Sequence, residues 1–169
     1  MHLESERLII REAKVSDASF YFELFNDPDW LNFINDKGLK TVKETENYLK
    51  DVLLKNSKLG GLGFFTVILK ETSQPIGAST ALQRDKLEFV DVGYGFLPKG
   101  RGKGYAAEAT KLIIEYVRTK FQQEKVLAFT MPKNEASQKL LKKLGFKYIG
   151  LQRVFEDSED SVFEYIFKK

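Results

Sequence analysis

The chain contains no cysteine, and its one histidine, His2, lies beside the amino terminus. Disulfides, thiolate metal sites, iron–sulfur clusters and cysteine nucleophiles are therefore excluded. Histidine-based catalytic triads and histidine-rich zinc sites are excluded for the same reason, and we expect no metal. No apolar run approaches ~20 residues, and the charged segment 1–7 does not resemble a signal peptide. We therefore expect a cytoplasmic protein that does not enter a membrane.

The composition is typical of a folded domain. The chain has 169 residues, of which 43% are hydrophobic, 30% charged and 13% aromatic. Its net charge of +3 and isoelectric point near 8.9 neither require nor exclude a nucleic-acid partner. The sequence shows no internal repeat, linker or low-complexity tract, and we predict a single mixed α/β domain over residues 1–169.

The spacing of apolar residues predicts the strands and helices. Strands are predicted over 7–12, 64–69, 76–82, 87–97, 126–131, 146–149 and 162–167. Helices are predicted after the capping residues 15–17, over 42–54, over 105–117, and from Asn134 to a C-terminal cap at Gly145. The segment 126–131 has almost no polar alternation, which is typical of a strand covered on both faces.

The segment 93–109 carries the strongest chemical signal. A predicted strand ends at Pro98, a loop with glycines at 100, 102 and 104 follows, and a helix begins at once. Glycines allow backbone N–H groups to approach a ligand closely, and a helix N-terminus adds partial positive charge. Lys99, Arg101 and Lys103 alternate with these glycines. Together these features predict a phosphate-binding site.

Three kinds of phosphate site use a glycine-containing loop of this type. A Walker A loop needs Ser or Thr after Gly-Lys, but Lys103 is followed by Gly104. Residues 102–107 match the dinucleotide fingerprint G-x-G-x-x-A, which is a weak signal alone. The next strand, however, ends at residues 131–134 without an acidic side chain, and too little chain follows for a doubly wound sheet. The third kind is an acyl-coenzyme A pyrophosphate site.

Four segments, in order along nearly the whole chain, favour the third kind. They are Glu6–Arg11 with Asp17 and Asn26–Pro28; Lys99-Gly100-Arg101-Gly102-Lys103-Gly104; Tyr105-Ala106-x-Glu108-Ala109; and Asn134–Ser137 with Lys143–Phe146. In these segments the chain resembles the GNAT acyltransferases, and more closely their RimJ/RimL-like branch of ribosomal-protein N-acetyltransferases. The loop departs from the family's Q/R-x-x-G-x-G/A pattern only in having lysine first.

The resemblance implies an α+β fold. Its central, mostly antiparallel twisted sheet is splayed between the fourth and fifth strands and flanked by about four helices. Acetyl-CoA would lie in the splay, against strand amides of Phe96 and Leu97, where Pro98 ends the pairing. The resemblance also assigns cofactor contacts to Lys99, Arg101, Gly102, Lys103, Gly104, Tyr105, Ala106, Asn134, Ser137 and Lys143. Gly93 and Gly95 share a strand face and either leave room for a ligand or mark a bulge.

The reaction implied is direct attack of a neutral amine on the acetyl thioester in a ternary complex. Asp91 and Glu88, the predicted strand carboxylates nearest the splay, are the candidate bases, acting directly or through water. Many family members place a tyrosine acid where this chain has Leu141. That departure leaves Ser137, a water molecule or no dedicated acid to protonate the thiolate.

The acceptor is left open by the sequence. A primary amine is expected, with a protein N-terminal α-amine and a small-molecule amine as alternatives. A catalytically silent, CoA-binding sensor or interaction module is a further hypothesis, because Leu141 removes the usual acid. A nucleic-acid-binding protein is disfavoured by the lack of a basic cluster outside the loop region. The acidic run 156–160 either attracts a cationic amine or is a solvated loop, and Trp30 either packs in the core or contacts substrate. Either a monomer or a homodimer is compatible with the sequence.

Overall fold

The computed structural model describes residues 1–58, 60–155 and 158–168. Within them eight strands form one sheet in the order β1-β2-β3-β4-β5-β6-β8-β7. Every neighbouring pair is antiparallel except β5 and β6, which are parallel. The strands are β1 (His2–Glu4), β2 (Leu8–Glu12), β3 (Gly63–Leu69), β4 (Gln74–Leu82), β5 (Asp91–Phe96), β6 (Lys125–Thr130), β7 (Lys147–Phe155) and β8 (Ser158–Ile166).

The helices cover the two faces of this sheet. They are α1 (Ala18–Phe25), α2 (Pro28–Phe33), α3 (Val42–Ser57), α4 (Tyr105–Phe121) and α5 (Glu135–Leu144). Helix α4 packs on β4 and β5 and α5 on β6 and β7, while α3 packs on α1 and β3. The larger buried cluster lies beneath α4 and includes Phe65, Val92 and Ile113. A second cluster lies beneath α1 to α3 and includes Tyr21, Phe25 and Trp30.

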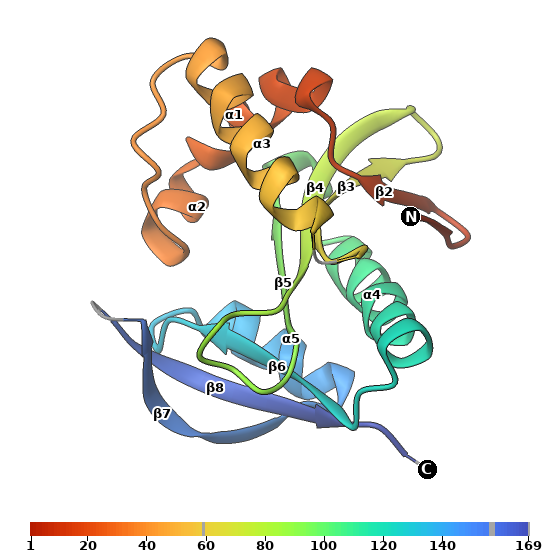
Figure 1. Cartoon of the computed structure of the whole chain (residues 1–169), viewed down its shortest axis with the longest axis vertical. Coiled ribbons are helices and arrows are strands. Elements are labelled where there is room, and N and C mark those ends of the chain that lie inside the picture. The colour runs from red at the N-terminus through yellow and green to blue at the C-terminus, as the bar shows by residue number, and fades with distance from the viewer. Residues whose placement is uncertain (59, 156–157, 169) are drawn as a thin grey trace.

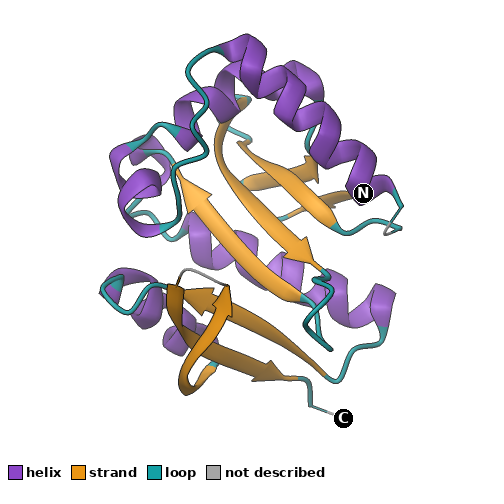
Figure 2. Ribbon diagram, turned by 60° about the vertical axis from the view of Figure 1, so that its left-hand side comes forward, coloured by secondary structure: helices purple, strands orange, loops and turns teal. Residues whose placement is uncertain are grey.

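The sheet opens between β5 and β6, the fourth and fifth strands of the sequence prediction. Their ladder consists of the single pair Asp91–Leu127, beside which the Leu127 N–H donates to the carbonyl of Val90 at 3.0 Å. On its other edge β5 pairs with β4 along its whole length. Figures 1 and 2 show the two strands diverging beyond that point. The splayed α+β fold predicted from the sequence is confirmed.

Helix α2 and strand β1 were not predicted. Asn26–Pro28 was interpreted only as the end of the preceding helix, but Pro28 also occupies the first position of α2, where its missing N–H costs nothing. The Asp27 side chain caps this helix by accepting from the Asp29 N–H at 3.1 Å. The same short segment therefore ends one helix and begins the next.

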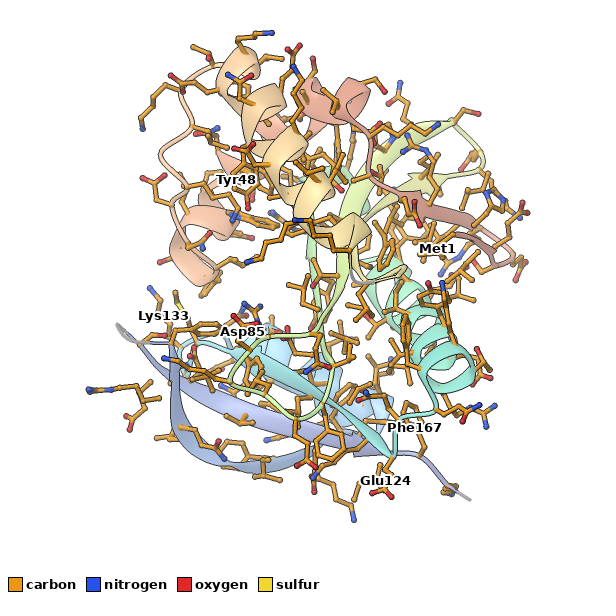
Figure 3. The ribbon with its side chains drawn as sticks, viewed as in Figure 1. Met1, Tyr48, Asp85, Glu124, Lys133 and Phe167 are labelled. Carbon is orange, nitrogen blue, oxygen red and sulfur yellow. The ribbon has the colours of Figure 1, made fainter. Side chains whose placement is uncertain are left out.

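Several strand predictions were inaccurate. Strand β7 runs to Phe155 rather than to residue 149, and β8 begins at Ser158 rather than at residue 162. Strand β5 begins at Asp91 rather than at residue 87, because residues 83–90 form a loop closed by the Gln83 side chain, which donates to the carbonyl of Leu87 at 2.6 Å. Asp85 marks this loop in Figure 3, where it passes in front of β6. Strand β6 buries only alternate residues, so it is not covered on both faces. Among the described residues, none of the helices has the length and apolar composition of a membrane span.

Candidate active site

The edge of β5 that faces the sheet opening offers backbone amides to a ligand. The Leu97 N–H donates to the Ile76 carbonyl at 3.0 Å, so it points toward β4. Because successive residues of a strand direct their N–H groups to opposite edges, the amides of Phe96 and Tyr94 face the opening. The N–H of Phe96, one of the two donors expected from the sequence, therefore lies at the opening. The Leu97 N–H, the second donor expected from the sequence, is instead held by β4, whereas the Tyr94 N–H faces the opening.

The glycine loop connects the end of β5 to the N-terminus of α4. Gly102 and Gly104 have φ values of +73° and +81°, in the left-handed region that favours glycine. Gly104 is the N-cap of α4 and makes no side-chain cap, so the first-turn amides at Tyr105 and Ala106 have no intrahelical acceptor. Lys99 and Lys103, in the segment that leads into α4, are exposed. This arrangement fits a pyrophosphate group.

Arg101 does not join the other basic side chains at this site. Its Nη2 forms an ion pair with the Asp27 carboxylate, and its Nη1 lies 2.9 Å from Asp29 Oδ2. Its Nε donates to the Phe96 carbonyl at 2.9 Å. The phosphate contact predicted for Arg101 is therefore not supported, because its guanidinium is already held by two carboxylates of the α2 segment. Arg101 instead fixes the loop to α2.

A second ion pair, between Arg7 and Glu108, holds the same loop where it enters α4. The Arg7 Nε and Nη2 atoms lie 2.8 and 2.5 Å from Glu108 Oε2, and Nη1 donates to the Lys103 carbonyl at 3.0 Å. The guanidinium also lies over the Tyr105 ring, 4.5 Å from its centroid. Burial raises the pKa of Glu108, but hydrogen bonds from Ser5 and Arg7 outweigh it and hold the pKa below its ordinary value. These contacts position the first turn of α4.

The two candidate bases lie in different surroundings. Asp91 is 3% exposed, at the point where β5 and β6 diverge, and its carboxylate accepts from Arg84 Nε at 2.6 Å and Nη2 at 3.2 Å. Burial raises the pKa of Asp91, and the Arg84 guanidinium opposes that rise without cancelling it. Glu88 lies exposed in the loop before β5 rather than on the strand. Of the two candidate bases, Asp91 is therefore the carboxylate that is buried at the opening.

The segment 134–141 faces the opening from the other side. The Asn134 side chain is the N-cap of α5 and accepts from the Ser137 N–H at 3.1 Å. The Ser137 hydroxyl lies 2.9 Å from the hydroxyl of Tyr94 on β5. Burial raises the pKa of Tyr94 to about 12. Leu141 is 1% exposed and belongs to the core, while Lys143 lies exposed in the last turn of α5, at the other end of the helix from Asn134.

The glycine face of β5 accommodates protein side chains. A Cβ on Gly95 would collide with the ring of Trp30, and one on Gly93 would lie 2.8 Å from Thr80 Oγ1. The expectation that this face holds a ligand is corrected accordingly. Trp30 is 7% exposed and packs in the core, and within the described residues its Nε1 has no hydrogen-bond partner.

Helix α2 is also connected to the chain beyond β6. The Lys133 ammonium donates to Asn32 Oδ1 at 2.8 Å, and Figure 3 marks Lys133 on the side of the opening nearest α2. In the acidic run, Glu156 and Asp157 lie outside the described residues, and Asp160 is buried with its Oδ2 3.0 Å from the Ser158 hydroxyl. At Asp160, therefore, the solvated-loop interpretation does not hold.

Residues 7–147 match the family model described as an acetyltransferase (GNAT) domain. The uncharacterised N-acetyltransferase p20 of Bacillus licheniformis is 28% identical over 167 residues, which cover 98% of this chain and 93% of that protein. The crystal structure of ribosomal-protein-S5-alanine acetyltransferase from Vibrio fischeri superposes with a TM-score of 0.80 and 22% identity, covering 98% and 96% of the two chains. RimL, a ribosomal L7/L12 alpha-N-protein acetyltransferase solved with coenzyme A, superposes with a TM-score of 0.84 and 14% identity, covering 98% of both chains.

Proposed function

The chain belongs to the GNAT acetyltransferase family, and from that premise we propose that it transfers the acetyl group of acetyl-CoA to the α-amine of a protein N-terminus. The observation that carries the proposal is the continuity of the open β5 edge with the glycine loop and the N-terminus of α4. A pantetheine arm has amide groups that can pair with a strand edge as an added strand would. Its pyrophosphate would then reach the free amides of the helix.

The proposed acetyl-CoA contacts come from β5 and the glycine loop on one side of the opening and from α5 on the other. The Phe96 and Tyr94 amides would hold the pantetheine, while Gly102, Gly104 and the first-turn amides of Tyr105 and Ala106 would hold the phosphates. Lys99 and Lys103 add positive charge there. Arg101 supports this site through the Phe96 carbonyl and Asp27 rather than by touching phosphate. Asn134 and Ser137 would border the arm from α5.

The chemical step requires a neutral amine. Its nitrogen attacks the thioester carbonyl, the C–N bond forms, and the C–S bond breaks with its electron pair on sulfur. A strand N–H facing the opening would polarise the carbonyl. We assign proton acceptance to Asp91, directly or through water, because its carboxylate is buried where the strands diverge. Glu88 is the alternative base, and Ser137 is the candidate donor to the thiolate.

Support for a peptide acceptor comes from the structural neighbours. Two of them are named for acetylation of ribosomal proteins, one at the α-amine of L7/L12 and one at an alanine of S5. A small-molecule amine is the alternative acceptor. Asp91 could serve as the base for either acceptor, since a peptide N-terminus and a small amine both carry an ammonium group that must lose a proton.

Calorimetric titration with acetyl-CoA, with NAD and ATP as controls, tests the cosubstrate first. Selective binding of acetyl-CoA is expected, and no binding at millimolar concentration would refute the proposal. Transfer is then measured on peptides with free N-termini and on a panel of polyamines, aminoglycosides and amino acids. Turnover that is lost in Asp91→Asn would exclude a silent CoA-binding module, and preference for small amines would replace the peptide acceptor.

A further inference from the structure

Two hydroxyl groups from opposite sides of the sheet opening meet within hydrogen-bond distance. Tyr94 extends from β5 and Ser137 from the first turn of α5, and their hydroxyl oxygens are 2.9 Å apart. Either oxygen can be the donor in this contact. The Tyr94 hydroxyl also lies 3.4 Å from the Ser137 carbonyl oxygen, a longer and therefore weaker contact than the one between the two hydroxyls. Ser137 is itself fixed, because its N–H donates to the Asn134 cap.

Leu141, the neighbour of Ser137 on the next turn of α5, adds no polar group to this pair of hydroxyls. Its side chain is buried and has no proton to donate. Tyr94 is half-buried and packs against the core cluster that lies beneath α4. Its position next to Phe96, whose amide faces the opening, places it along the strand edge proposed to bind the thioester-bearing arm.

We propose that Tyr94 is a positioning residue for departure of the leaving thiolate. Its hydroxyl donates to Ser137 Oγ, so that the Ser137 proton is directed to the sulfur atom as the C–S bond breaks. This inference rests on the proposed acetyl transfer. The sulfur receives the bonding electron pair and is stabilised by the Ser137 hydrogen bond. The proton that finally makes the thiol comes from water, which balances the proton that the amine released.

The pKa values of the phenol and of a thiol favour a hydrogen bond over full proton transfer from Tyr94. Burial raises the pKa of Tyr94 to about 12, so the phenol stays protonated across neutral and mildly alkaline pH. A thiol has a reference pKa of about 8.5, so proton transfer from this phenol to a thiolate is unfavourable by roughly three to four orders of magnitude. A permanently protonated phenol is, by contrast, a constant donor to the serine oxygen.

Steady-state kinetics of Tyr94→Phe, Ser137→Ala and the double variant test the proposal. With acetyl-CoA, Tyr94→Phe should lower kcat roughly tenfold while KM for acetyl-CoA stays within about twofold. The double variant should lose no more than Ser137→Ala alone, because Tyr94 acts through the serine. Ser137→Thr, which keeps a hydroxyl, should recover most of the loss.

A second acetyl donor separates this role from a structural one. S-phenyl thioacetate has an aryl thiolate that departs without a hydrogen bond, so the loss in Tyr94→Phe should nearly disappear with it. Equal losses on both donors, additive losses in the double variant, or an unchanged kcat would overturn the inference. Tyr116→Phe is the matched control, since that hydroxyl donates to the Gly61 carbonyl at 2.8 Å and should show no change on either donor. A wild-type protein that turns over neither donor would refute the proposed function itself.

Discussion

Arg101 in the glycine loop and Asp27 at the start of α2 form an ion pair across 74 residues of sequence. Asp27 is 8% exposed and also caps α2, while Arg101 also binds the Phe96 carbonyl at the end of β5. One guanidinium therefore ties together the helix that carries Trp30, the open strand edge and the loop that is proposed to bind phosphate. Changes at this contact should affect stability and cosubstrate binding together.

Replacing Arg101 with alanine should destabilise the fold by about 1–3 kcal/mol, because the buried Asp27 carboxylate then has no cation. Affinity for acetyl-CoA should fall as well, since the loop loses its anchor to Asp27 and Phe96. Urea unfolding gives the first quantity and calorimetric titration the second. Asp29→Asn is the matched control: its side chain is 55% exposed, so its ion pair with the same arginine contributes no more than about 1 kcal/mol. If both variants behaved alike, the buried pair would not be what holds the loop.

Gly104→Val should reduce affinity for acetyl-CoA at least tenfold, a loss of about 1.4 kcal/mol in binding. Gly104 has a φ of +81°, which a β-branched side chain adopts only with strain, and it opens the helix whose amides are proposed to face the phosphates. Calorimetric titration measures the change. Gly38→Val is the control, because Gly38 has a φ of +68° and open space around it, yet lies outside the loop. A Gly104 variant that kept full affinity would make the loop a structural turn only.

The local features of the site could be predicted from the sequence. The glycine loop, the proline that ends β5 and the Asn134 cap each depend on a few consecutive residues, so short-range patterns are sufficient to locate them. The start of β5 was placed too early because the apolar residues between 87 and 90 resemble a strand. Pairing ends at Asp91, since its partner Leu82 is the last residue of β4.

The contacts that join the local features could not be predicted in the same way. Arg101 alternates with the glycines as a phosphate ligand would, yet the carboxylates that it binds are Asp27 and Asp29 at the start of α2, more than 70 residues away in the chain. Arg7 and Glu108 are separated by 101 residues. Spacing carries no information about such pairs. A sequence signal did exist, because each partner belongs to one of the segments that carry the family resemblance.

Glu108→Gln should remove part of the acid dependence of stability. The folded pKa of Glu108 lies below its ordinary value of 4.5, so its ionised form stabilises the fold above that pH. This stabilisation is lost as pH falls through the folded pKa. The difference in unfolding free energy between wild type and variant should therefore be largest near neutral pH and shrink as the pH falls below 4.5 and through the lowered folded pKa. Glu115→Gln, whose partner Arg118 is on the same exposed helix face, should show a smaller difference. A difference that does not change with pH would rule out the Arg7–Glu108 charge pair as its source.

The pH dependence of acetyl transfer should identify the base. Burial raises the pKa of Asp91 and Arg84 lowers it, so removing the guanidinium in Arg84→Gln leaves only the raising effect. The acid limb of the kcat/KM profile should therefore move to higher pH in Arg84→Gln and return toward the wild-type position in Arg84→Lys, which keeps a positive charge. Asp91→Asn should lower kcat by at least about a hundredfold without changing acetyl-CoA binding.

Glu88→Gln distinguishes the two carboxylates. Glu88 is exposed in the loop and has no part in the Arg84–Asp91 contact, so its removal should leave both kcat and the acid limb in place if Asp91 accepts the proton. A large fall in kcat for Glu88→Gln, together with an acid limb that does not respond to Arg84, would assign the base to Glu88. Asp91 would then serve to hold Arg84 against Phe155, where the guanidinium lies 4.8 Å from the ring centroid, and its burial would be a feature of the fold rather than of the reaction.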